Sequence, residues 1–239
     1  MERAKIRLFV DAALGAAQCV ELTKDQAHYL FSVMRLGDGD RVALFNGRDG
    51  EWTARLQRAS KRAGQAQCEG LALVQTMPPD LWLYFAPIKK ARTDFIVEKA
   101  AELGVRRIVP VQTQFTNAER IRRDRLQAHA VEAAEQCGAV FVPEVAELCR
   151  LDAALDEMGA RRVMFCDEAL AGAGAALDGE KGAPWAILIG PEGGFSDTER
   201  AKIAAREGAV AVSLGPRILR ADTAAVAAIT LWQIRLGDW

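Results

Sequence analysis

The feature that most constrains the fold is a regular alternation of short apolar runs and helical patterns, which begins near residue 81 and continues to the C-terminus. Alternation at this spacing is typical of βαβ units, because a chain reaches the next parallel strand through a crossover that is usually a helix. We therefore predict a mostly parallel sheet. Its expected strands are 81–86, 107–111, 140–142, 161–165, 185–189 and 209–214, and its expected helices are 93–103, 123–137, 147–158, 197–207 and 222–235.

The first 75 residues have a different pattern, with short alternating runs between turn clusters. One helix is expected over 23–34, with Thr23 as its N-cap. This pattern predicts a small β-barrel over residues 1–75. The Met77-Pro78-Pro79-Asp80 segment is the expected boundary to a second domain at 81–239. The strands expected in the barrel are 6–10, 41–45, 52–57 and 67–74.

Composition narrows the class of protein. The 239 residues are half apolar and about a quarter charged, as in an ordinary globular protein. No apolar run approaches the roughly 18 residues of a membrane span, and the N-terminus does not resemble a secretory signal. Five scattered cysteines without C-x-x-C spacing, with two histidines, argue against a disulfide framework and a metal site. We expect a cytoplasmic protein.

The net charge of −1 hides an asymmetry along the chain. Residues 84–127 contain ten Lys and Arg against five Asp and Glu, whereas residues 128–239 contain ten against seventeen. Two interpretations remain open for the basic segment. Its arginines form either a solvated helix face or a local surface that binds phosphate groups.

Two glycine-rich loops near the C-terminus are the strongest candidates for a binding site. The first, Gly190-Pro191-Glu192-Gly193-Gly194-Phe195, follows the apolar run 185–189 and precedes Ser196-Asp197-Thr198-Glu199, which has capping-box spacing. The second, Gly215-Pro216-Arg217-Ile218-Leu219-Arg220, precedes a helix that is apolar around most of its circumference. Glycine permits positive φ and close backbone approach, and ligands of parallel sheets bind at the carboxyl ends of strands. Both loops are expected there.

Other motifs are weaker. Gly172-Ala173-Gly174 lacks the third glycine of a dinucleotide fingerprint, so we interpret it as a connection. Arg217 and Arg220 serve no apolar core, and they are candidates to hold phosphates or a developing anion.

On these residues the chain resembles the RsmE family of 16S ribosomal RNA uracil-N3 methyltransferases, within the SPOUT superfamily. The two glycine loops together are the most specific part of the resemblance. The other matching segments are Arg7-Leu8-Phe9-Val10, Val33-Met34-Arg35-Leu36, Gly39-Asp40-Arg41-Val42, Pro87-Ile88-Lys89-Lys90, residues 98–105 and residues 132–137.

The resemblance implies a PUA-like β-barrel followed by an α/β domain tied in a deep trefoil knot. It also implies S-adenosylmethionine as the cofactor, 16S ribosomal RNA in an assembled small subunit as the substrate, and a homodimer. No metal is implied. The expected cofactor-binding residues are Gly190, Glu192, Gly193, Gly194, Leu214, Gly215, Leu219 and Arg220.

The resemblance also suggests roles for charged residues. Arg220, with Arg217 as a second candidate, is expected to stabilise negative charge on the uracil oxygens. Glu192 either accepts a proton or faces the positive sulfonium. The expected RNA-binding residues are Arg7, Arg35 and Arg41 of the barrel, with Lys89 and Lys90 beside the site.

Two departures from the family pattern and two alternatives remain. Relatives often carry an arginine in the stretch where this chain has Gln114-Phe115-Thr116, and Asp222 stands where they often carry a glutamate. The role of Asp222 and any RNA contacts near Phe115 are therefore open. The first alternative is a related methyltransferase acting on a tRNA base or a ribose 2′-hydroxyl. The second is a non-catalytic RNA-binding or ribosome-assembly module.

Overall fold

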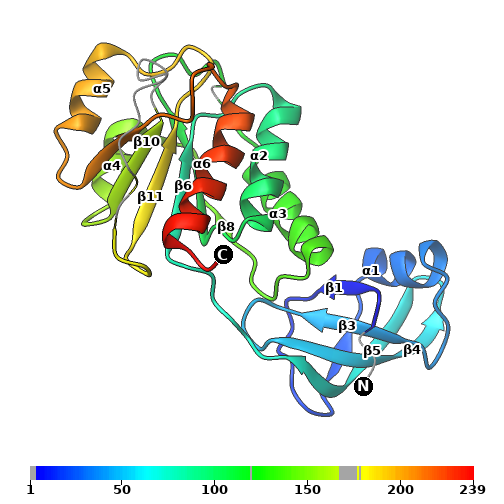
Figure 1. Ribbon diagram of the computed structural model, residues 1–239. Coiled ribbons are helices and arrows are strands. Elements are labelled where there is room, and N and C mark those ends of the chain that lie inside the picture. Colours follow the sequence, from blue (N-terminus) through cyan, green and yellow to red (C-terminus); the bar gives the residue numbers. More distant parts are fainter. Residues whose placement is uncertain (1–3, 119, 167–176, 178) are drawn as a thin grey trace. The chain divides into compact units, whose positions relative to one another are not determined.

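The computed structural model describes residues 4–118, 120–166, 177 and 179–239, and it separates them into two compact units (Figure 1). The N-terminal unit contains residues up to Met77 together with Ala134–Val142. The C-terminal unit contains Pro78–Ala133 and Pro143–Trp239. The sequence predicted a single boundary between residues 75 and 81. It did not predict that residues 134–142 belong to the first unit. The Gly172–Gly174 segment lies outside the described residues.

The N-terminal unit is a five-stranded sheet in the order β1-β3-β4-β5-β2. The pair β1–β3 is parallel, and the other pairs are antiparallel. The strand β2, centred on buried Val20, was not predicted because only three residues pair. The bounds are β1 (Arg7–Phe9), β2 (Cys19–Glu21), β3 (Arg41–Phe45), β4 (Glu51–Ser60) and β5 (Ala63–Leu73).

The predicted helix 23–34 begins as expected and then changes type. Thr23 caps α1 (Lys24–His28) in a capping box with Gln26. The chain continues as the π-helical segment η1 (Tyr29–Val33), in which the amide of Met34 donates to the carbonyl of Tyr29 at 2.9 Å. The wider turn accommodates two consecutive buried side chains, Leu30 and Phe31, against the sheet core.

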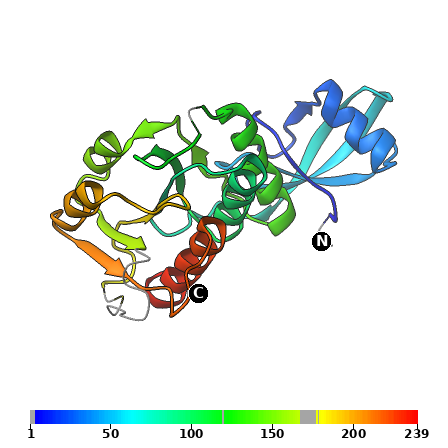
Figure 2. The same cartoon turned by 90° about the horizontal axis from the view of Figure 1, so that it is seen from above.

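The C-terminal unit is an α/β/α sandwich. Its parallel strands follow the order β12-β10-β11-β6-β7-β8, and β9 pairs with β7. Helices α2 and α6 cover one face, and α4 and α5 cover the other (Figures 1 and 2). The strands are β6 (Leu81–Phe85), β7 (Arg107–Gln112), β8 (Glu144–Val145), β9 (Cys149–Arg150), β10 (Arg162–Cys166), β11 (Trp185–Ile189) and β12 (Ala209–Val212). The helices are α2 (Lys90–Glu102), α4 (Leu151–Glu157), α5 (Asp197–Ala204), α6 (Ala221–Leu236) and α3 (Arg123–Cys137), of which the part from residue 134 on belongs to the N-terminal unit.

Apolar packing on both faces holds this sheet in place. All five residues of β11 are buried, as expected for a central parallel strand. Val163, Phe165 and Leu188 pack on the face covered by α4 and α5, in one cluster with Leu151 and Ile203. The predicted parallel sheet is confirmed.

The connections place two strand ends at a switch point. The chain leaves β6 through α2 to reach β7 on one side, whereas it leaves β11 through α5 to reach β12 beyond β10 on the other. Because β6 and β11 are neighbours, the loops after them diverge at the same edge of the sheet. Such a crevice is the usual ligand site of an open parallel sheet.

Two elements differ from prediction at the β8 edge. The expected strand 140–142 is wrong, because those residues belong to the N-terminal unit and pairing begins only after Pro143, where Val145 pairs with Ile108. The expected helix 147–158 begins later. Cys149 and Arg150 form β9 beside β7 first, and α4 starts at Leu151.

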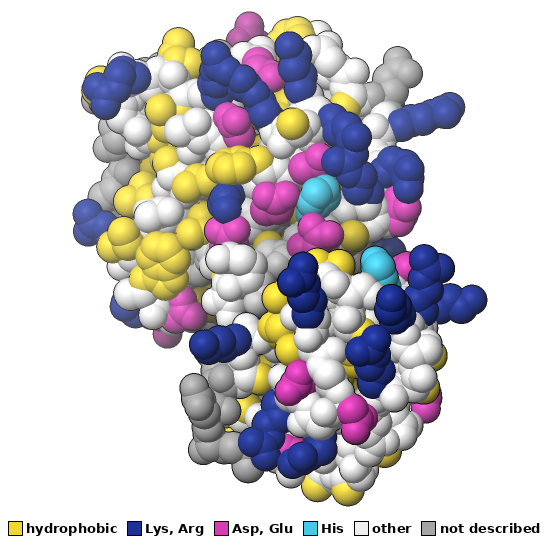
Figure 3. Space-filling model, turned by 90° about the vertical axis from the view of Figure 1, so that its right-hand side faces the viewer, with side chains coloured by type: hydrophobic (Ala, Val, Ile, Leu, Met, Phe, Trp, Pro, Cys, Tyr) yellow, Lys and Arg dark blue, Asp and Glu magenta, His cyan; other side chains and the backbone are white. Residues whose placement is uncertain are grey.

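The basic segment contributes to the face that carries α2 and α3. On this face of the C-terminal unit, Lys and Arg side chains alternate with Asp and Glu (Figure 3). Several of them are paired. Lys99 bonds to Glu102 at 2.6 Å, and Arg125 bonds to the mostly buried Asp94. The positive excess is therefore partly neutralised by neighbouring carboxylates.

Arg7, an expected RNA contact, is instead a structural residue of the N-terminal unit. Its side chain is only 8% exposed, and its Nε lies 2.6 Å from the carboxylate of fully buried Glu51. The guanidinium also donates to the carbonyls of Ala134, Glu135 (2.8 Å) and Ala139 (2.7 Å). These carbonyls are at the end of α3 and just after it, so Arg7 caps that terminus. Four of its five N–H donors are used in these bonds, so the buried guanidinium is poorly placed to bind a phosphate.

We predict that Arg7→Ala lowers the free energy of unfolding by about 3 kcal/mol or more, because it removes the ion pair of the buried Glu51 carboxylate and the hydrogen bonds to three carbonyls. Urea denaturation followed by circular dichroism measures this loss. The exposed Arg62→Ala is the matched control and is expected to change stability by no more than about 0.5 kcal/mol. Adding Glu51→Gln to Arg7→Ala should recover part of the loss. Wild-type stability in Arg7→Ala would contradict the assignment.

Candidate functional site

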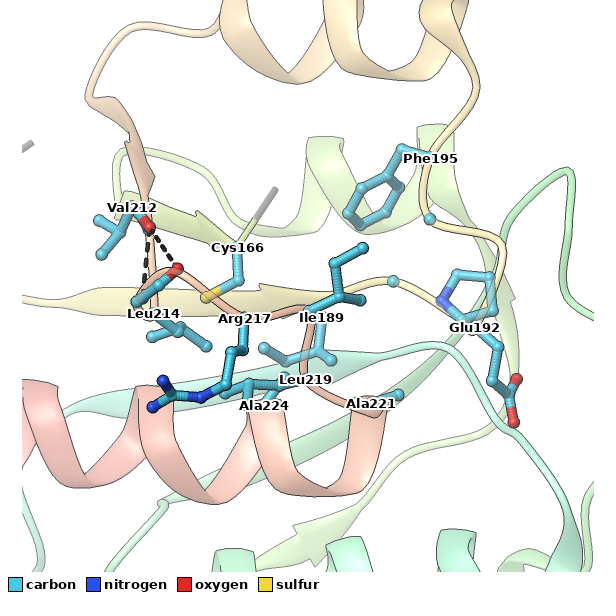
Figure 4. A pocket seen from close by; sticks show the side chains of 16 residues that line it. Cys166, Ile189, Glu192, Phe195, Val212, Leu214, Arg217, Leu219, Ala221 and Ala224 are labelled. Atoms are coloured by element: carbon cyan, nitrogen blue, oxygen red, sulfur yellow. Dashed lines mark hydrogen bonds between the residues drawn. The ribbon is translucent and has the colours of Figure 1, made fainter. Parts of the chain in front are cut away.

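The two glycine-rich loops lie together at the carboxyl edge of the parallel sheet and enclose a cleft (Figure 4). The first loop leaves β11 after Ile189, and the second leaves β12 after Val212. The end of β10, at Cys166, and the start of α6, at Ala221, complete the walls. The predicted placement of both loops at strand ends is confirmed.

Local hydrogen bonds shape the first loop. The amide of Gly194 donates to the carbonyl of Pro191 at 2.9 Å, and Gly194 has φ +67°, which favours glycine. A Cβ at Gly190 would lie 3.1 Å from the ring of Phe195. Ser196 then caps α5 in the predicted capping box with Glu199. The loop is thus a tight turn anchored to a capped helix.

The second loop is held in a similar way. The hydroxyl of Ser213 accepts from the amide of Gly215 at 3.3 Å. Gly215 has φ +117°, a conformation that other residues rarely adopt. Arg220 is the N-cap residue of α6, and its side chain makes no capping bond. Its backbone conformation turns the chain into the buried helix.

The cleft between the loops is narrow, and both polar and apolar groups line it. The space within it that water-sized molecules can occupy is about 80 Å³. The small side chains of Ala221 and Ala224 let α6 begin close to the loops. The apolar lining residues are Ile189, Pro191, Phe195, Val212, Leu214, Ile218 and Leu219.

Most of the predicted cofactor-binding residues line this cleft. Gly190, Glu192 and Gly194 come from the first loop, and Leu214, Gly215 and Leu219 come from the second. Gly193 is not in the lining. A Cβ at Gly193 would lie 3.2 Å from Cβ of Phe115, so this glycine faces a neighbouring turn.

The charged candidates sit at the rim. Arg217 and Glu192 both line the cleft, but they lie on opposite sides of it in Figure 4. Arg220 is exposed at the start of α6 and is not among the lining residues. Asp222 lies in the first turn of α6, 3.8 Å from the guanidinium of Arg92 on α2. The Asp222 carboxylate therefore forms an ion pair with an arginine of another helix.

Sequence reasoning did not include Cys166, Ala221 and Ala224 in the site. Burial raises the pKa of the Cys166 thiol to about 12, so the thiol is neutral and a poor nucleophile. Ala224 is half-buried and lies four residues before the buried Ala228. The apolar pattern of this segment indicated a buried helix, but it did not indicate which end of the helix faces a ligand. These residues shape the cleft rather than react.

The remaining RNA-binding candidates lie in separate units. Arg35 is exposed in the N-terminal unit, in a left-handed conformation with φ +58°. Arg41 is also exposed there, and its hydrogen bond is the main reason that the pKa of the Glu69 carboxyl is lowered. Lys89 and Lys90 are exposed at the start of α2 in the C-terminal unit. Apart from Arg7, the candidates are accessible.

The described residues contain neither a metal cluster nor a membrane-spanning helix. No group of three or more His, Cys, Asp and Glu residues is arranged to hold a metal ion there. Within the same residues, no helix is both long and apolar enough to cross a membrane.

Comparison with known proteins agrees with this geometry. Residues 75–233 match the model of an RNA methyltransferase domain, and residues 22–67 match that of an RNA methyltransferase PUA domain. The ribosomal RNA small subunit methyltransferase E of Synechocystis is 31% identical over 218 residues, which cover 88% of this chain and 71% of that protein. The chain belongs to the ribosomal RNA small subunit methyltransferase E family.

Two solved structures of similar proteins match this chain over nearly all of its length. Methyltransferase E of Neisseria gonorrhoeae, bound to S-adenosyl methionine, is 29% identical with a TM-score of 0.86, covering 98% of this chain and 99% of that one. A putative methyltransferase of Legionella pneumophila in complex with the bound cofactor SAM is 28% identical, with a TM-score of 0.89 and complete coverage of both chains. The methyltransferase E fold is therefore present from end to end.

We predict that Ser196→Ala destabilises this methyltransferase E homologue by about 1 kcal/mol, because the α5 amide of Glu199 loses its cap. The matched control is Thr198→Ala, an exposed residue of the same first turn. Thermal unfolding by calorimetry distinguishes the two variants. Equal melting temperatures for both would show that the capping box does not stabilise the loop.

Proposed function

We propose that the chain transfers a methyl group from S-adenosylmethionine to N3 of a uridine in 16S ribosomal RNA. The observation that carries the proposal is the cleft between two glycine loops at the switch point of a parallel sheet, in a chain that belongs to the methyltransferase E family. Two relatives of matching fold contain this cofactor.

The cleft suits a nucleoside-like cofactor. Its interior presents the aliphatic side chains of Ile189, Leu214 and Leu219 to a flat apolar ring. Gly190 and Gly215 lack side chains where the backbone approaches the cleft, and at Gly190 a Cβ would press on the Phe195 ring. We assign cofactor binding to six residues that line the cleft: Gly190, Glu192, Gly194, Leu214, Gly215 and Leu219.

When bound, S-adenosylmethionine supplies an electrophilic methyl group on a sulfonium. Uracil N3 is a weak nucleophile until it loses its proton, and negative charge then spreads onto the ring oxygens. Arg220 is a permanent cation with five donors beside the cleft residue Ala221, which suits it to stabilise that charge. Arg217 at the rim is the second candidate for this role.

Among the described residues that line the cleft, Glu192 is the only carboxylate. We therefore assign Glu192 as the acceptor of the N3 proton. Its exposure leaves it open to water, which carries the proton away. Asp222 is not assigned to this step, because it lies against Arg92.

The substrate must present an unpaired uridine, since N3 lies on the base-pairing edge. We assign RNA contacts to Arg35 and Arg41 of the N-terminal unit and to Lys89 and Lys90 of the C-terminal unit. Arg7 is left out because it is buried against Glu51.

The finer features of the family complete the proposal. We propose that the N-terminal sheet closes into a PUA-like barrel, that the second loop and α6 form a trefoil knot, and that two chains form a dimer. The assembled small ribosomal subunit is the proposed substrate. Acting on ribosomal RNA would place the protein in the cytoplasm.

A strain that lacks this gene should lose 3-methyluridine from its 16S ribosomal RNA, and the wild-type chain should restore it. Arg220→Ala is expected to bind S-adenosylmethionine normally and to transfer methyl groups about 10²- to 10³-fold more slowly. Mass spectrometry of digested RNA and titration calorimetry measure the two properties. The control is Arg235→Ala, an exposed arginine in the last turn of α6.

Loss of a different methylated nucleotide from that strain would reassign the target. Full activity of Arg220→Ala would remove this residue from the mechanism.

Gly190→Ala is expected to weaken S-adenosylmethionine binding about tenfold, because the new Cβ presses on the Phe195 ring in the wall of the cleft. Calorimetric titration measures the affinity. The control, Gly70→Ala, adds a methyl group with no heavy atom within 4 Å. Unchanged affinity in Gly190→Ala would mean that the cofactor binds elsewhere.

A further inference from the structure

Phe115 is a large, partly exposed aromatic side chain beside the first glycine loop. Its side chain belongs to the turn that follows β7, and the residue is 43% exposed. An isolated exposed apolar residue needs no explanation by itself. Phe115 differs from such a residue in three respects. Hydrogen bonds hold its turn in place, a glycine of the first loop packs against its side chain, and a basic hollow follows its turn.

The turn that carries Phe115 is rigid. The amide of Thr116 donates to the carbonyl of Thr113 at 3.2 Å, and the hydroxyl of Thr116 accepts from the amide of Thr113 at 2.9 Å. The amide of Gln114 donates to Oε1 of Glu199 at 2.8 Å. Because Glu199 also forms the capping box of α5, the turn is anchored to the helix that follows the first glycine loop.

Gly193 brings that loop into contact with the aromatic side chain. A Cβ at Gly193 would lie 3.2 Å from Cβ and 3.5 Å from Cγ of Phe115. The loop therefore has two functional sides. Gly190 and Gly194 line the cleft, whereas Gly193 packs on Phe115. This packing explains why a third glycine is needed in the loop although it does not line the cleft.

A basic hollow continues from the same turn. Ala118, three residues after Phe115, lines a hollow with Lys90 and Arg120. The Cα atoms of residues 115 and 118 are at most about 11 Å apart along the chain. Neither Lys90 nor Arg120 forms an ion pair with a described residue, whereas Arg122 and Arg125 in the same hollow pair with Asp124 and Asp94. Within the described part of the chain, these two cations are left to bind an external anion.

We propose that Phe115 stacks on an unpaired base of the substrate RNA, while Lys90 and Arg120 bind a phosphate of the same strand. This inference rests on the proposed function and adds a substrate-positioning residue to it. An exposed aromatic ring on the turn that leads into a basic hollow is a combination that suits single-stranded nucleic acid, because every base has a π face and every nucleotide a phosphate. Methylation at a pairing edge requires such an unpaired strand.

The test compares three variants of the full chain: Phe115→Ala, Phe115→Leu and Phe115→Trp. Stacking predicts that Phe115→Ala raises KM for the 30S subunit, or for its 16S RNA, about tenfold. Phe115→Leu keeps apolar area without a π face and should resemble the alanine variant. Phe115→Trp should bind at least as well as wild type. The affinity for S-adenosylmethionine should stay unchanged in all three.

The phosphate contact has a separate readout. Arg120→Ala should weaken RNA binding and reduce the slope of log affinity against log salt by about 0.7, the value for one phosphate of a single strand. Arg235→Ala, an exposed cation on α6, should leave this slope unchanged. Filter binding at several salt concentrations measures it. An unchanged slope for Arg120→Ala would overturn the phosphate contact.

Three results would overturn the stacking role. They are an unchanged KM in Phe115→Ala, a Phe115→Trp variant as weak as alanine, and a change in the solution mass of Phe115→Ala by light scattering, which would show a protein contact. Failure of the proposed function looks different, since the wild-type chain would then not methylate 16S RNA.

Discussion

The parallel pairing of β11 with β6 is the contact on which the C-terminal unit depends. Residues Trp185–Ile189 align one for one with Leu81–Phe85, and flanking backbone bonds extend the pairing, from Trp185 to Asp80 and from Ala86 to Ile189. Both strands are central and almost wholly buried, so a one-residue slip in register would exchange the side chains that pack on the two helical layers. The register therefore fixes where the first glycine loop leaves the sheet, and with it one wall of the cleft.

Features with a local cause could be predicted from the sequence. The run Trp185–Ile189 consists of five apolar residues, and the strand predicted from it has the observed bounds. Ser196 and Glu199 are three residues apart, and this spacing alone identifies the start of α5. The positions of both loops followed from the same logic, because a parallel sheet brings all its carboxyl ends to one edge.

Features with a distant cause could not be predicted. Arg7 looks like any cation on an edge strand, and its burial depends on Glu51 and on carbonyls more than 120 residues away. Val140 and its neighbours have the composition of a strand, but they belong to the N-terminal unit. The contact between Gly193 and Phe115 is likewise invisible in the sequence, since a glycine does not reveal which neighbour approaches it.

The carboxylate of Glu199 connects the first glycine loop to the turn that carries Phe115. Oε2 accepts from Ser196 at the start of α5, and Oε1 accepts from Gln114 in the turn that carries Phe115. One side chain therefore ties the end of the first glycine loop to the aromatic turn. If the cofactor and the RNA each restrict the motion of this loop and turn, the first to bind pays the cost in conformational entropy and the second does not. Each ligand then increases the affinity of the other by the same factor. Cofactor and RNA binding would then be thermodynamically coupled without any change in the position of the backbone.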